Sequence, residues 1–180
     1  MAPAPVGVAL VGFGYAGRTF HAPLIQDCAG LKLHTVVTSR PEAVAAALPE
    51  ARTSITLPEA LADPAVGLVV LATPNALHGP QARAALEAGK AVVVDKPFAL
   101  SLVEARELAA LAETRGLLLS VFHNRRWDAD FLALQEAIAA GRLGEVRTFE
   151  SRFDRFRPEV RDRWRERDEP GAGLWYALGP

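Results

Sequence analysis

Short runs of apolar residues, many of them β-branched, recur along the first two thirds of the chain and alternate with segments of mixed polarity. Continuous apolar runs of this length are typical of strands that are buried on both faces of a parallel sheet. They predict strands over residues 6–11, 31–38, 67–72, 91–95 and 117–122, and a short strand over 54–56. The intervening segments predict helices over residues 17–27, 41–48, 58–62, 75–88 and 101–115. Strands that alternate with helices indicate an α/β fold with a doubly wound parallel sheet.

The first apolar run ends in a turn with the spacing Gly-x-Gly-x-x-Gly, made of Gly12, Phe13, Gly14, Tyr15, Ala16 and Gly17. Gly12 permits a tight turn, Gly14 lets the backbone approach a pyrophosphate, and Gly17 lets the next helix pack closely on the strand. An ordinary strand-to-helix turn is the alternative. Because the turn follows a hydrophobic strand and precedes a second one, the pattern favours a Rossmann-type dinucleotide-binding fold.

The end of the second strand bears on the choice of dinucleotide. Sites for NAD usually carry Asp or Glu about 20 residues beyond the glycines, whereas sites for NADP carry a small residue and a nearby Arg. Here Ser39 and Arg40 occupy that place, and Arg40 could bind a 2′-phosphate with two hydrogen bonds. The sequence therefore favours NADP over NAD. The alternative for Arg40 is a solvated loop residue before Pro41.

Polar residues follow the run at 67–72 as well. Because ligands of open parallel sheets lie outside the carboxyl ends of the strands, we expect Thr73, Pro74 and Asn75 to line the path of the cofactor. Asn75 is equally suited to cap the helix that follows. His78 is expected in the first turn of that helix rather than on a metal.

The strand at 91–95 ends in Asp95, Lys96 and Pro97. A lysine at this position, in a turn that proline fixes, can place an ammonium beside the nicotinamide and the substrate oxygen. A surface ion pair of Asp95 with Lys96 is the alternative. Ser101 and Glu104 then have the spacing of a capping box at the start of the next helix.

The pattern changes after residue 122. A cluster of polar and aromatic residues at 123–128 precedes a predicted helix over 131–140, and the alternation over 145–154 predicts a half-exposed strand of another kind. We therefore expect a dinucleotide-binding domain over 1–122 and the beginning of a second, α+β domain over 123–180.

The overall composition limits the classes of partner. The chain has 180 residues, 50% of them hydrophobic, and a formal net charge of −1. The near balance of charges predicts no nucleic-acid or membrane partner, and instead a small molecule or another subunit. Cys28 is the only cysteine, which excludes an internal disulfide, and we expect it to be a small core residue. We expect no metal site. No apolar run approaches the roughly 20 residues that span a bilayer, and the first residues lack signal-peptide features, which predicts a cytoplasmic protein.

Taken together, these motifs resemble the Gfo/Idh/MocA family of NAD(P)-dependent sugar and cyclitol oxidoreductases over essentially the whole chain. Asp95-Lys96-Pro97 stands for the family's Glu-Lys-Pro, and the string 124–128 is similar to the NADP-dependent scyllo-inositol dehydrogenase-like branch. The resemblance implies that Lys96 lies in the active site and that its neighbours help to hold the nicotinamide ribose. It also implies that Trp164 and Arg165 contact the cofactor, and we add to these the residues Asn124 and Arg126.

The family segment similar to residues 171–180 runs directly into a catalytic histidine, and this chain stops one residue before it. Ala177 stands where many relatives carry Asp. Family members continue for another domain that closes the substrate site and forms a dimer interface. We therefore expect the chain to be incomplete within its C-terminal domain, and homo-oligomers once that domain is completed.

The expected activity is hydride transfer between NADP(H) and a carbinol or carbonyl carbon of a sugar or cyclitol such as an inositol. Lys96 would stabilise the charge that develops on the substrate oxygen, and His123 is a weak candidate for the general acid/base. The alternative is a catalytically incomplete dinucleotide-binding module that needs a partner or the missing domain. A structural protein that has lost the ligand is a further, minor alternative.

Overall fold

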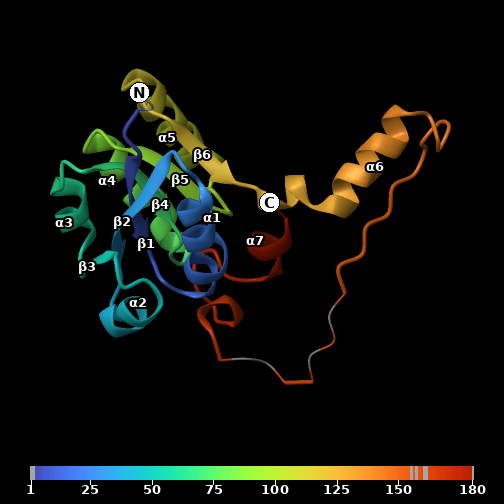
Figure 1. Cartoon of the computed structure of the whole chain (residues 1–180). Helices are drawn as coiled ribbons and strands as arrows, with labels where there is room; N and C mark the ends of the chain where they lie inside the picture. The colour runs from blue at the N-terminus through green and yellow to red at the C-terminus, as the bar shows by residue number, and fades with distance from the viewer. Residues whose placement is uncertain (1–2, 155, 157, 160–161, 180) are drawn as a thin grey trace.

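A computed structural model of the chain describes every residue except 1–2, 155, 157, 160–161 and 180. Its centre is one six-stranded, fully parallel sheet in the order β3-β2-β1-β4-β5-β6 (Figure 1). The strands are β1 (Val6–Val11), β2 (Leu31–Val37), β3 (Arg52–Ser54), β4 (Val66–Leu71), β5 (Ala91–Asp95) and β6 (Leu119–Phe122). This strand order is that of a Rossmann-type doubly wound sheet, which confirms the predicted fold class.

Helices cover both faces of the sheet (Figure 1). The α-helices of the described residues are α1 (Ala22–Asp27), α2 (Pro41–Ala47), α3 (Leu57–Ala62), α4 (His78–Glu87), α5 (Leu102–Thr114), α6 (Ala129–Ala139) and α7 (Leu174–Leu178), and α1 to α5 contribute to the cores on the two faces. Four short helical turns complete the set: η1 (Gly17–His21), η2 (Asn75–Leu77), η3 (Asn124–Trp127) and η4 (Trp164–Glu166). No helix in the described part of the chain combines the length and apolar character needed to cross a membrane.

Alternate residues of the central strands enter two separate cores. On β1, Val8 and Leu10 pack with α1 and α2, whereas Ala9 and Val11 pack with α3, α4 and α5. All four side chains are almost fully buried. The continuous apolar runs are thus explained by burial on both faces of a parallel sheet.

Several predicted boundaries shift by a few residues. The short strand lies at 52–54 rather than 54–56, and the last strand begins at Leu119 rather than at 117. The prediction that Cys28 is a core residue is wrong, because it is exposed just after α1. These differences all lie at or near the ends of helices and strands. There the pattern of apolar and polar residues indicates neither the exact boundary nor the burial of a single residue.

The capping box before α5 forms only in part. The Glu104 backbone N–H donates to Ser101 Oγ over 3.1 Å, as predicted. The Glu104 carboxylate, however, accepts a hydrogen bond from the N–H of Leu100 rather than from that of Ser101. The carboxylate therefore fixes the loop before the helix as well as its first turn.

The predicted strand over 145–154 is wrong. All of these residues are exposed, and none belongs to a strand. Ion pairs join Glu145 to Arg147 and Glu150 to Arg152, two residues apart, as an extended backbone allows. A strand also needs a neighbour for its N–H and C=O groups, and α6 with this segment stands apart from the sheet (Figure 1).

Replacing Leu108 with Ala is expected to lower the free energy of unfolding by about 2–5 kcal/mol, because it leaves a cavity in the core under α5. Leu102 on the same helix is 64% exposed, so Leu102→Ala is the matched control and should change stability by about 0.5 kcal/mol or less. Urea unfolding followed by circular dichroism measures both changes. Equal losses in the two variants would contradict this packing of α5.

Candidate functional site

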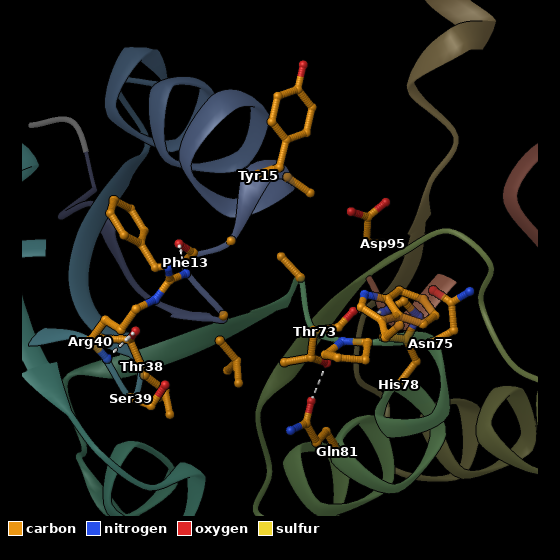
Figure 2. A pocket seen from close by; sticks show the side chains of 18 of the residues that line it. Phe13, Tyr15, Thr38, Ser39, Arg40, Thr73, Asn75, His78, Gln81 and Asp95 are labelled. Atoms are coloured by element: carbon orange, nitrogen blue, oxygen red, sulfur yellow. Dashed lines mark hydrogen bonds between the residues drawn. The ribbon is translucent and has the colours of Figure 1, made fainter. Parts of the chain in front are cut away.

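A cavity of about 510 Å³ opens at the carboxyl ends of β1, β2, β4 and β5 (Figure 2). Residues from the glycine turn, from the strand ends and from η4 line it. The predicted site residues among them are Gly12, Phe13, Gly14, Tyr15, Ala16, Ser39, Arg40, Thr73, Pro74, Asn75, His78, Asp95, Lys96, Trp164 and Arg165. Residues as far apart in the sequence as Val11 and Arg165 therefore meet around one cavity.

Four predicted site residues lie outside this lining. A Cβ on Gly17 would lie 2.2 Å from the carbonyl oxygen of Gly12, so Gly17 serves the close packing of the turn. Pro97 follows a cis peptide bond and lines a second cavity. Asn124 and Arg126 belong to η3, beyond the end of β6.

The glycine turn leaves its backbone open to the cavity. Gly12 has a φ of +96°, and a Cβ there would lie 2.6 Å from the carbonyl oxygen of Ala72. A Cβ on Gly14 would meet no atom within 4 Å. The first glycine thus makes the turn possible, and the second presents a bare backbone to whatever fills the cavity, as a bound pyrophosphate requires.

Arg40 extends from the end of β2 toward the glycine turn (Figure 2). Its backbone N–H donates to Thr38 Oγ1 over 3.0 Å, and its guanidinium lies 3.4 Å from the carbonyl oxygen of Phe13. Arg40 and Ser39 together form the wall of the cavity at this end. The guanidinium keeps donors free for an anionic ligand.

Two buried polar residues join the ends of β4 and β5. His78 places Nδ1 2.7 Å from the carbonyl oxygen of Pro97 and Nε2 2.9 Å from that of Thr73. A neutral imidazole donates through only one nitrogen, so both contacts are hydrogen bonds only in the protonated ring. His78 is the first residue of α4, as predicted.

Asn75 does not cap a helix. Its side-chain amide donates to the carbonyl oxygen of Gly171 over 2.7 Å, and the residue is 5% exposed. The helix-cap alternative is therefore wrong, because this side chain instead fastens the C-terminal segment to the end of β4.

Asp95 contributes a carboxylate to the described lining of the cavity. One of its oxygens accepts the Lys96 backbone N–H over 2.7 Å, and the other lies 3.4 Å from Nε2 of His21. Burial alone would raise the pKa of Asp95, but the hydrogen bond and charge of His21 and the Lys96 N–H outweigh it and lower this pKa. The carboxylate is thus stabilised in its ionised form.

Lys96 lies beside Asp95 and donates from Nζ to the carbonyl oxygen of Ala177 on α7. Burial lowers the pKa of Lys96, and the charges of Arg165 and Arg125 lower it further, although Asp95 acts in the opposite direction. The surroundings of Lys96 thus favour its neutral form more than water does.

The lining is positively charged although the whole chain carries −1. Among the described residues of the lining, Arg40, Lys96, Arg163 and Arg165 contribute four cationic groups against the carboxylate of Asp95, and Glu166 pairs with Arg163 at 2.6 Å. Such a cavity suits an anionic ligand. Among the described residues, no three His, Cys, Asp or Glu side chains gather as a metal site would require.

Sequence reasoning missed several residues of this site. Thr38, Gln81 and Arg163 line the cavity, and Gln81 Oε1 accepts a hydrogen bond from Thr73 Oγ1 over 2.7 Å. The position of Gln81, one helical turn after His78, is a signal that could have found it. His21 contacts Asp95 from outside the lining, and no local pattern indicates that contact.

Comparisons with known proteins show which family this chain is similar to. A family described as "Oxidoreductase family, NAD-binding Rossmann fold" matches residues 6–123, and one described as "GFO/IDH/MocA C-terminal domain" matches residues 131–180. The Escherichia coli protein "Uncharacterized oxidoreductase YdgJ" is 56% identical over 97% of this chain and 51% of its own length. The Bacillus subtilis "scyllo-inositol 2-dehydrogenase (NADP(+)) IolW" is 39% identical over 97% of this chain and 49% of its own.

A solved structure extends this likeness to three dimensions. The NAD-binding protein from Listeria innocua superposes with a TM-score of 0.87 at 30% identity, covering 96% of this chain and 51% of its own. The chain thus spans about half the length of the relatives that it matches.

The pKa of Lys96 is expected to lie below the ordinary lysine value of about 10.4. Asp95→Asn should lower it further, because a negative charge that favours the ammonium is removed. Arg165→Gln should raise it, because a repelling positive charge is removed. A ¹³C NMR titration of the methylated chain measures each pKa, with Lys96→Arg to assign the signal. Shifts of both variants in the same direction would contradict the electrostatics described above.

Proposed function

The chain belongs to the GFO/IDH/MocA family of oxidoreductases, and on that premise we propose that it binds NADP(H) in the cavity at the strand ends. We further propose that the protein takes part in hydride transfer to or from a carbinol or carbonyl carbon of a sugar or cyclitol. The observation that carries the choice of cofactor is the end of β2, where Ser39 and Arg40 form the cavity wall.

The charges at this end support a 2′-phosphate. Asp95, the carboxylate of the described lining, stands at the end of β5 rather than of β2. No carboxylate among the described lining residues at β2 would therefore repel the phosphate or bind a free 2′-hydroxyl, and Arg40 is placed to pair with the anion. IolW, a relative named for NADP(+), agrees with this choice, whereas the Listeria relative is named for NAD.

The glycine turn fits the pyrophosphate of such a cofactor. Backbone approach at Gly14 is unobstructed, and the turn that it belongs to depends on the positive φ of Gly12. With the adenosine half at β2 and the pyrophosphate at the glycine turn, the nicotinamide half extends over β4 and β5. That path ends beside Lys96.

Lys96 is the residue that we assign to the chemistry. When bound, the nicotinamide supplies or accepts the hydride. The Lys96 ammonium would hold the substrate oxygen and stabilise the charge that develops on it. One of the three ammonium N–H donors is directed at the carbonyl oxygen of Ala177, and the others can donate to a substrate hydroxyl or carbonyl. The name of IolW supports a polyol such as an inositol as the substrate class.

A second candidate function is dinucleotide binding without turnover. A complete dehydrogenase needs a general acid/base at the substrate oxygen. In the described part of the chain, His78 is held between two backbone carbonyls, and His123 lines the second cavity with Trp175 and Tyr176. His78 lines the first cavity but both of its ring nitrogens face carbonyl oxygens, and His123 lines the second cavity, so neither is placed as the general acid/base. This arrangement favours binding without efficient catalysis.

Replacing Arg40 with Ala is expected to weaken NADPH binding by about 10-fold to 100-fold, the value of a hydrogen bond to a charged group. The affinity for NADH should change by no more than about threefold, because NADH lacks the 2′-phosphate. Isothermal titration of the full chain with each dinucleotide measures both. Arg83 pairs with Glu107 on the surface, so Arg83→Ala is the matched control. Equal losses for NADPH and NADH would contradict the assignment to NADP(H).

An assay of NADPH formation from NADP⁺ with a panel of inositols and sugars separates the two candidate functions. If the chain turns over, Lys96→Met should lower kcat/KM by about 10²-fold to 10³-fold, because one donor to the developing oxyanion is lost. Lys32→Met, on exposed β2 surface, is the control and should leave kcat/KM unchanged. A chain that binds NADPH without turning over any member of the panel would favour the second function.

A further inference from the structure

His21 is a buried residue that the proposed chemistry has not yet used. It is 3% exposed and ends the η1 turn, which follows directly from the glycine turn. Its ring packs against Phe122 at the end of β6, with ring centroids 4.4 Å apart. The side chain therefore crosses from the first helical segment to the far half of the sheet.

The η1 turn has a geometry that turns His21 inward. The N–H of Ala22 donates to the carbonyl oxygen of Gly17, five residues earlier, which makes this segment a π-helical turn. Arg18, Thr19 and Phe20 are exposed, whereas the first and last residues of the turn, Gly17 and His21, are buried, so His21 contributes its buried side chain. Single π-helical turns occur frequently at functional sites because they redirect one side chain.

Inside the protein, His21 meets Asp95. Nε2 of His21 lies 3.4 Å from one carboxylate oxygen of Asp95, and the other oxygen accepts the Lys96 N–H over 2.7 Å. Each carboxylate oxygen of Asp95 thus has a partner within the protein, and the carboxylate still lines the cavity. A separation of 3.4 Å is long for a hydrogen bond, and contacts of this kind tighten when a ligand completes the site.

We propose that His21 is a positioning residue for the nicotinamide half of the cofactor site: it holds the Asp95 carboxylate in the orientation that accepts a hydroxyl of the nicotinamide ribose. This inference rests on the proposed binding of NADP(H). His21 touches no cavity space itself, so its effect passes entirely through Asp95.

Asp95 needs such a partner for an electrostatic reason. The other charged side chains of the described lining are cationic. The proposed ligand, NADP(H), carries several negative charges, which a carboxylate repels. An unheld carboxylate would turn toward Lys96 or repel the pyrophosphate. The hydrogen bond and charge of His21 keep Asp95 ionised and directed, consistent with the lowered pKa of Asp95.

The alternative is a histidine that merely fills the core between α1 and β6. The two roles differ in which part of the cofactor they affect. A packing role would alter the whole binding domain, whereas a positioning role acts only at the end of β5. Adenosine 2′,5′-bisphosphate, which lacks the nicotinamide riboside, reports on the β2 end alone.

The test compares NADPH with adenosine 2′,5′-bisphosphate in titrations of the full chain. His21→Leu keeps an apolar side chain of similar size but no donor, and should weaken NADPH about 10-fold, as loss of a hydrogen bond to a charged group does. The affinity for the bisphosphate should stay within about twofold of the wild-type value, because Arg40 and the glycine turn are untouched. His21→Gln, whose amide can reach the same carboxylate oxygen, should restore NADPH binding to within about threefold.

Asp95→Asn gives an independent check that does not need a folded His21→Leu protein. It should produce the same selective loss for NADPH, and adding His21→Leu to it should cause no further loss. Equal weakening of both probes by His21→Leu or by Asp95→Asn would overturn the inference, as would unchanged NADPH affinity in His21→Leu. Failure of the wild-type chain to bind either probe would instead overturn the proposed function, and the inference with it.

Discussion

The parallel pairing of β1 with β2 on one side and β4 on the other is the constraint on which the rest of the molecule depends. Parallel strands place all their carboxyl ends along one edge of the sheet. The helices after β1 and β2 pack on one face and those after β4 and β5 on the other, so the loops diverge between β1 and β4. The cavity opens at this divergence, and the ends of β1, β2 and β5 and the residues that follow β3 and β4 line it.

Buried polar side chains hold the diverging loops at fixed separations. His78 joins the end of β4 to the turn after β5, Asn75 joins it to Gly171, and His21 joins the first helical segment to Asp95. Among the described residues, no buried side-chain nitrogen or oxygen lacks a hydrogen-bond partner. Because an unpaired buried polar group is costly, each of these bonds also specifies one arrangement of the loops. Contacts within the protein therefore fix the arrangement of the loops around the cavity.

Local pattern was enough to predict the sheet, the glycine turn and the placement of Ser39 and Arg40, because strand burial and turn glycines are set by neighbours in the sequence. Contacts between distant segments were not accessible in this way: His21 and Asp95 are 74 residues apart. The strand predicted over 145–154 was wrong for the same reason, since a strand requires a partner that the sequence pattern does not name. Asn75 had two equally good local interpretations, and only its bond to Gly171 separates them.

The two halves of the cavity differ in what they depend on. The β2 end is built from residues 12–40, all within one βαβ unit with a shared core. The β5 end also depends on the C-terminal segment. The Ala177 carbonyl oxygen of this segment accepts a hydrogen bond from the Lys96 ammonium, and its Arg165 lowers the pKa of Lys96. The β2 end of the cavity is thus built largely within the first unit. The surroundings of Lys96 depend instead on how the C-terminal segment is held, so the two ends of the cavity are built by different parts of the chain.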